Sequence, residues 1–92
     1  MKSNALRISD ADNVVIATRP ISMGEQVIVK GQRLFAAAQD TEAGHKIAAA
    51  PIHAGESVIR YGEPIVQVTK AIARGEWVHV HNTRPAPGDL KQ

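Results

Sequence analysis

Cysteine is absent from the 92 residues, which excludes disulfide bonds and thiolate metal sites. Aromatic residues make up only 3% of the chain while hydrophobic residues make up 43%, so the core must be built from Val, Ile and Ala, as in short packed strands. No apolar run approaches the length that crosses a membrane, and the first residues lack the apolar segment of a signal peptide. We therefore expect a cytoplasmic protein without a membrane partner.

An excess of charge of either sign is also missing. The chain has 11 Lys and Arg against 9 Asp and Glu, for a net charge of +2. The basic residues are scattered singly and are not interleaved with aromatic residues, as they would be along a nucleic-acid-binding stripe. The sequence therefore predicts no nucleic-acid partner.

The length limits the chain to one domain with a small core. Such a core is only marginally stable by itself, which favours a partner subunit, either a second copy or a different chain. We expect the domain to span residues 1–82. The remaining residues, 83–92, contain two prolines and are predicted to be an irregular tail.

A repeated turn is the clearest pattern in the chain. The segments "PISMGEQV" (20–27), "PIHAGESV" (51–58) and "AIARGEWV" (71–78) share the form Ile-x-x-Gly-Glu-x-Val, at irregular spacing. The glycine is suited to a turn with positive φ, and the valine is the first buried residue of the strand that follows. The repeat is therefore a structural device before it is a functional one.

A fourth, degraded copy is present in "DTEAGHKI" (40–47). Here Thr41 replaces the isoleucine, Ile47 replaces the valine, and His45 stands where the other copies have glutamate. A polar substitution in a unit that is otherwise reused for packing points to a site rather than to the scaffold.

Short runs of Val, Ile and Ala between Gly, Pro and Asp predict about seven strands. These are residues 13–18, 26–29, 33–38, 46–50, 57–61, 65–69 and 77–82. Only "RLFAAAQDTEA" (33–43) could form a helix instead, and it is short for one. We therefore predict an all-β, compact and strongly bent domain with at most one short helix.

The stretch "GEWVHVHN" (75–82) carries the first candidate site. The alternation of a strand would place Val78 and Val80 on the core face, and Trp77, His79 and His81 on the other. His79 and His81 could then bind a metal ion or act as acid and base. The alternative is that both are ordinary strand residues hydrogen-bonded to their neighbours.

The stretch "GHKIA" (44–48) carries the second candidate site. His45 and Lys46 follow a turn glycine, where side chains and free N–H groups can meet an anion such as a carboxylate. The alternative is a solvated turn. Arg60 could bind a carboxylate too, or cover apolar surface at a strand edge. His53 is interpreted as a surface turn residue.

At "GHKIA", "VIRYGEPI" and "GEWVHVHN", from about Asp12 to Asn82, the sequence resembles the N-terminal SAF-type domain of the altronate and galactarate dehydratase family. The resemblance implies a β-clip fold. In that family the domain is fused to a large catalytic domain or is a separate small subunit, as in sulfolactate sulfo-lyase.

The resemblance implies β-elimination of water from a sugar acid such as altronate or galactarate, with a large catalytic subunit as partner. It points to His45, His79 and His81 for catalysis and to Lys46 and Asn82 for substrate binding, and Arg60 joins the substrate-binding residues through its side-chain chemistry. A divalent metal, Fe²⁺ or Mn²⁺, would be held mainly by the partner, with His79 and His81 as candidate ligands. A sulfolactate sulfo-lyase subunit and a non-enzymatic SAF or antifreeze-like binding module are the alternatives.

Overall fold

The computed structural model describes residues 2–79 and 81–85. These residues form three small antiparallel sheets, with strand orders β1-β2-β5-β8, β3-β4 and β6-β7-β9. The strands are β1 (Ala5–Leu6), β2 (Val14–Ala17), β3 (Gln26–Val29), β4 (Gln32–Ala36), β5 (Lys46–Ala48), β6 (Ser57–Arg60), β7 (Glu63–Val68), β8 (Trp77–Val78) and β9 (Thr83–Pro85). The prediction of an all-β domain is confirmed, with nine short strands rather than seven.

Residues 33–43 do not form the short helix that was the alternative to a strand. Its first half is β4, which pairs with β3, and the described residues contain no helix. Phe35 and Ala37 are buried while Leu34 and Ala36 are exposed, which is the alternation of a strand. No segment among the described residues is a helix that could cross a lipid bilayer.

The first three residues of the predicted irregular tail, 83–85, form a strand. Thr83–Pro85 form β9, which pairs with β7 at the edge of the third sheet. An edge strand tolerates Pro85 because one side of the strand needs no ladder hydrogen bonds. The rest of the expected tail, residues 86–92, lies outside the described residues.

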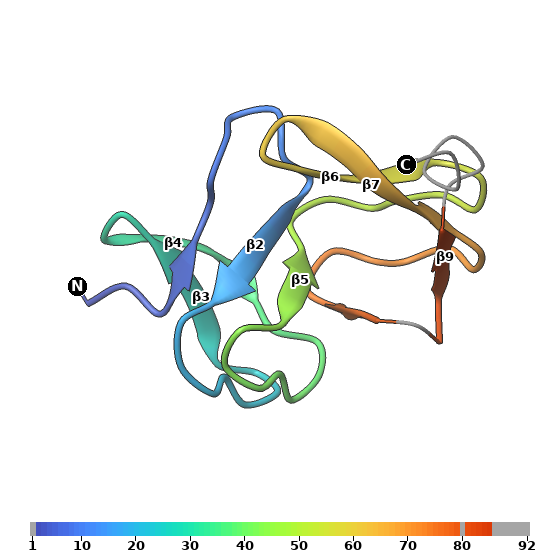
Figure 1. Ribbon diagram of the computed structural model, residues 1–92. Coiled ribbons are helices and arrows are strands. Elements are labelled where there is room, and N and C mark those ends of the chain that lie inside the picture. The colour runs from blue at the N-terminus through green and yellow to red at the C-terminus, as the bar shows by residue number, and fades with distance from the viewer. Residues whose placement is uncertain (1, 80, 86–92) are drawn as a thin grey trace.

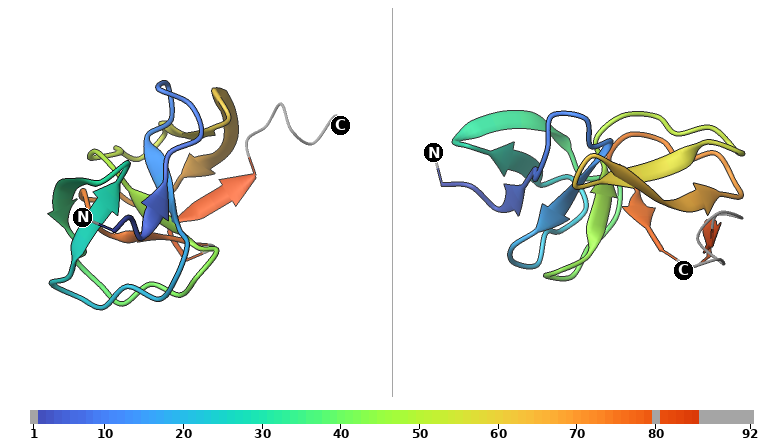
Figure 2. Two further views of the ribbon diagram at one scale, coloured as in Figure 1. Left: turned by 90° about the vertical axis from the view of Figure 1, so that its left-hand side faces the viewer. Right: turned by 45° about the horizontal axis from the view of Figure 1, so that its top comes forward.

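The central β2–β5 pair lies between two hairpin arms (Figures 1 and 2). The β3–β4 hairpin lies on one side, and β6, β7 and β9 lie on the other. Each hairpin turns at a residue–glycine pair with positive φ at both positions, Lys30–Gly31 and Tyr61–Gly62, as tight hairpin turns require.

Two hydrophobic clusters fill the spaces on the two faces of this central pair. The first holds Val15 and Ile47, together with residues of β1, β3 and β4. The second holds Val14 and Ala48, together with residues of β6, β7 and β8. Neighbouring residues of β2 and of β5 therefore serve different clusters, because successive side chains of a strand point to opposite faces.

The irregular spacing of the repeated turn conceals a duplication. The first and second copies are 31 positions apart (51 − 20), and so are the fourth and third (75 − 44). The strand pairing repeats with the same shift: Ile16 pairs with Lys46 in β2·β5, and Ile47 pairs with Trp77 in β5·β8. Single bridges join the isoleucine or threonine positions of the copies, Ile21 to Thr41 and Ile52 to Ile72.

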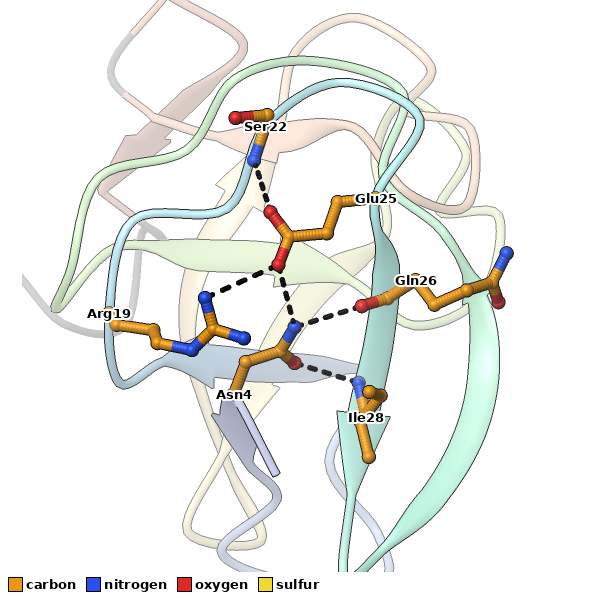
Figure 3. Close-up of polar contacts among 6 residues, drawn as sticks. All are labelled: Asn4, Arg19, Ser22, Glu25, Gln26 and Ile28. Atoms are coloured by element: carbon orange, nitrogen blue, oxygen red, sulfur yellow. Dashed lines mark hydrogen bonds and ion pairs between the residues drawn. The ribbon is translucent and has the colours of Figure 1, made fainter. Parts of the chain in front are cut away.

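The glutamate that three copies of the repeat share holds its own turn. Oε1 of Glu25 accepts a hydrogen bond from the Ser22 N–H at 3.0 Å (Figure 3). The Glu25 N–H donates in turn to the Ser22 carbonyl at 2.9 Å. Glu56 and Glu76 make the same pair of bonds in their copies. In the fourth copy the imidazole of His45 makes no hydrogen bond to the backbone N–H three positions earlier. The His45 side chain is therefore not needed to hold its own turn.

Thr41 occupies the position of Ile72 in the duplication, and its buried hydroxyl has no hydrogen-bond partner among the described residues. An unpaired buried hydroxyl costs about 1–3 kcal/mol. We therefore expect Thr41→Val to leave the free energy of unfolding unchanged or to raise it by about 1 kcal/mol, measured by urea unfolding. The exposed Thr18→Val is the control; a clear loss of stability in Thr41→Val alone would contradict the reasoning.

Asp12 is a buried carboxylate that ties the start of the chain to the β6–β7 hairpin. Burial alone would raise the pKa of Asp12, but hydrogen bonds from the backbone of Gly62, Ser9 and Tyr61, with the charge of Arg7, outweigh burial and lower the pKa. The Gly62 and Ser9 N–H groups lie 2.8 and 3.1 Å from the carboxylate oxygens.

A carboxylate with a lowered pKa in the folded state stabilises the fold above the pKa of the unfolded chain, 3.8 for this group. That contribution is lost as the pH falls through the folded-state pKa. We therefore expect Asp12→Asn to lower stability at neutral pH, and the difference from the wild type to shrink below about pH 4. Urea unfolding across this range is the measurement, with the exposed Asp10→Asn as control; a difference independent of pH would contradict it.

Candidate functional site

The β5–β8 pair positions the candidate residues and divides them between two faces. Lys46 lies opposite Val78, and Ile47 lies opposite Trp77. Residues directly opposite each other in an antiparallel pair share a face. Lys46 therefore lies on the face of the second hydrophobic cluster, which contains Val78, and Trp77 lies on the face of the first, which contains Ile47.

A cluster of rings surrounds Trp77 and is called the Trp77 cluster below. It consists of His45, Trp77, His79 and His81. The His79 ring is stacked on the indole with centroids 4.2 Å apart, and the His45 and His81 rings lie 5.5 and 5.4 Å from it. His45 and His79 are half-buried, while His81 is exposed. Three of the four histidines of the chain therefore meet at the edge strand β8.

The rings gather on one face as the alternation suggested, but only part of the route is a strand. β8 ends at Val78, which is buried as predicted, and the predicted strand to residue 82 is wrong beyond that point. The chain then turns, with the Asn82 N–H donating to the His79 carbonyl at 3.1 Å. Val80 lies outside the described residues.

Asn82 is buried and holds this turn together. Its Oδ1 accepts the His79 N–H at 2.9 Å, and its Nδ2 donates to the Trp77 carbonyl at 2.9 Å. The Asn82 carbonyl accepts the Thr69 N–H, which fastens the turn to the end of β7. These contacts position the His79 backbone.

His45 is tied to Trp77 by a direct hydrogen bond. The indole Nε1–H donates to Nδ1 of His45 at 3.0 Å, across 32 positions of sequence. A pocket of about 260 Å³ opens beside the two rings and is also lined by Asp40 and Glu42. Sequence reasoning placed Trp77 beside the two histidines without giving it a role, and it did not name Asp40 and Glu42. The only signal for the two carboxylates was that both belong to the degraded copy of the repeat, residues 40–47.

Lys46 has Arg60 of β6 as its charged neighbour. Burial lowers the pKa of the Lys46 amine, and the positive charge of Arg60 lowers it further. The guanidinium of Arg60 lies 5.0 Å from the ring centroid of Tyr61, and its buried Nε has no hydrogen-bond partner among the described residues. Among the described residues neither Lys46 nor Arg60 forms an ion pair with a carboxylate, so the two positive charges favour an anion nearby.

The structure therefore divides the predicted site residues into two groups. The Trp77 cluster contains His45, His79 and His81, while Lys46 lies on the other face of β5, where the charge of Arg60 acts on it. His53 is an exposed turn residue outside both groups, as interpreted from its place in the repeat.

Residues 2–79 and 81–85 contain no group of three or more His, Asp or Glu side chains that could hold a metal ion. His79 and His81, whose ring centroids lie 6.2 Å apart, could supply two ligands at most. The described residues alone therefore do not fit a metal centre, and ligands from elsewhere would be needed.

Comparison with known proteins shows the family to which the chain belongs. The family model described as "Altronate/galactarate dehydratase SAF domain" matches residues 3–86, which include both groups of site residues. The chain belongs to this SAF domain family. The SAF domain is 36% identical over 86 residues to altronate dehydratase of Bacillus subtilis, and 40% identical over 87 residues to altronate dehydratase of Escherichia coli.

These alignments cover 94% and 95% of the SAF domain but only 17% of each dehydratase. The chain thus spans about a sixth of the length of these relatives. It is also 44% identical over 41 residues to the alpha subunit of (2R)-sulfolactate sulfo-lyase of Chromohalobacter salexigens, which covers 45% of this chain and 44% of that subunit.

Proposed function

We propose that this SAF domain contributes one wall of the active site of a sugar-acid dehydratase, whose larger catalytic polypeptide supplies the rest. The observation that carries the proposal is the Trp77 cluster, in which three imidazoles gather at an edge strand. Stacked half-buried rings at an unpaired edge suit a surface that a second polypeptide encloses. The hydro-lyase relatives, of which this chain matches 17%, support the reaction class.

In the proposed reaction a base removes the proton α to the carboxylate, and the β-hydroxyl leaves as water. The carbon–oxygen bond breaks as the oxygen takes a proton from an imidazolium. The leaving group is therefore neutral water, and the imidazolium becomes a neutral imidazole. His79 and His81 are the candidate donors, because their ring nitrogens form no hydrogen bond with any described residue and are available to the substrate. Lys46, with Arg60 as its charged neighbour, is the candidate group for a carboxylate of the substrate, on the face of β5 opposite the imidazoles.

The divalent metal that the resemblance implies, Fe²⁺ or Mn²⁺, would stabilise the enediolate when bound. In this proposal the larger polypeptide holds it, and the chemistry derived for this chain does not depend on it. The two polypeptides would act together in the cytoplasm. A second copy of the chain is a further possible partner.

The test is co-expression of the chain with the large polypeptide of a dehydratase from the same genome, followed by co-purification and assay. We expect a complex that dehydrates altronate or galactarate, while neither polypeptide does so alone. A complex that releases sulfite from sulfolactate would favour the second candidate, which the match to the sulfo-lyase alpha subunit supports. A chain that binds no such polypeptide would favour a non-enzymatic binding module and contradict the proposal.

A further inference from the structure

The bond between Trp77 and His45 determines which nitrogen of His45 carries a proton. The indole N–H can only donate, so Nδ1 of His45 must be the acceptor and must be free of hydrogen. A neutral imidazole with an unprotonated Nδ1 carries its proton on Nε2. Placing a proton on Nδ1 would require this bond to break.

Several contacts keep the indole in the place that this bond needs. His79 is stacked on it with a centroid distance of 4.2 Å, and the two ring planes differ by 14°. The Trp77 backbone N–H donates to Oε1 of Gln39 at 2.9 Å, and its carbonyl accepts the amide of Asn82. Held at the side chain and at the backbone, Trp77 has little freedom to release His45.

His45 is also free for such a role because of its place in the duplication. The equivalent residue, Glu76, is bound to its own turn at the Ala73 N–H with a 2.7 Å contact. His45 makes no corresponding bond and instead lines the pocket of about 260 Å³ with Trp77, Asp40 and Glu42.

We propose that Trp77 is a positioning residue that fixes His45 as its Nε2–H tautomer, so that His45 offers a hydrogen-bond donor to a ligand oxygen in this pocket. The carboxylates of Asp40 and Glu42, which also line this pocket, repel an anionic group, so the oxygen belongs to a hydroxyl of the substrate rather than to its carboxylate. The assignment to a sugar-acid hydroxyl rests on the proposed function, whereas the tautomer does not.

The test is long-range ¹H–¹⁵N NMR of the full chain labelled in its histidines, recorded near pH 8, where unperturbed imidazoles are neutral. We expect Nδ1 of wild-type His45 to show the chemical shift of an unprotonated nitrogen and Nε2 that of a protonated one. In Trp77→Phe, which keeps an aromatic ring but removes the donor, we expect this single tautomer to give way to averaged shifts. His53, in the same spectrum, is the internal reference and should not change.

A wild-type His45 with its proton on Nδ1, or a Trp77→Phe variant with unchanged His45 shifts, overturns the proposal. The wild-type spectrum decides even if the variant fails to fold. In a complex with the large polypeptide, Trp77→Phe should also raise KM or lower kcat for the hydroxy acid. A correct tautomer in a complex without dehydratase activity would refute the proposed function while leaving the role of Trp77 intact.

Discussion

Replacement of Gly75 by alanine is expected to lower the free energy of unfolding by about 2–5 kcal/mol. A Cβ at this position would lie 2.7 Å from the Ala36 carbonyl oxygen and 3.1 Å from the Ala38 nitrogen, both of which belong to the backbone. The Gly75 N–H donates to the Ala48 carbonyl and its own carbonyl accepts the Ala38 N–H, so the turn cannot move away without losing hydrogen bonds. For a domain of this size the loss is a large part of the total stability.

Gly55→Ala is the matched control. Gly55 has the same φ, +92°, in an equivalent turn, but no atom lies within 4 Å of the place of its Cβ. The free energy of unfolding of Gly55→Ala should therefore fall only by the cost of the left-handed conformation, about 1–2 kcal/mol. Urea unfolding of both variants separates the two contributions, and equal losses would show that the close approach at Gly75 is unimportant.

Replacement of His79 by phenylalanine is expected to lower kcat of the assembled dehydratase by about 10²- to 10⁴-fold, because it removes a proton donor. Phenylalanine preserves a ring that can stack on Trp77, where the wild-type centroids lie 4.2 Å apart, so packing is largely retained. The measurement is steady-state turnover of altronate or galactarate by the complex with the large polypeptide.

His53→Phe is the control for His79→Phe, since His53 is exposed and lies outside the site. It should leave kcat and KM unchanged. His81→Phe, assayed in parallel, tells which of the two imidazoles carries the proton. Wild-type turnover in both the His79 and His81 variants would remove these residues from catalysis, while unchanged tryptophan fluorescence would show that the fold was intact.

The turn pattern predicted much of the fold because its information is local. A glycine followed by glutamate and, two positions later, an apolar residue marks each turn and the start of a strand, and Val27, Val58 and Val78 are all buried. The ends of the elements were predicted less well. The strand at Trp77 was expected to run to residue 82 and ends at Val78, because the Asn82 side chain binds the backbone of Trp77 and His79 and turns the chain.

The duplication shows why the spacing of the repeats looked irregular. The copies at 20–27 and 40–47 belong to one half, and those at 51–58 and 71–78 belong to the other. The copy at 20–27 is therefore equivalent to the copy at 51–58, and the copy at 40–47 is equivalent to the copy at 71–78. The pairing of β2 with β5 and of β5 with β8 reveals the shift of 31 positions. Strand partners far apart in sequence leave no mark on the local pattern.

The sequence by itself determined most of the strands, the repeated turns and the presence of chemically capable residues in "GHKIA" and "GEWVHVHN", since these depend on residues near one another in the chain. Only the tertiary structure decided which of them meet. His45 joins Trp77 across 32 positions, while Lys46, the next residue, lies on the opposite face with Val78. The physical reason is that adjacent side chains of a strand point to opposite faces, and the register of long-range pairing chooses the partners on each face.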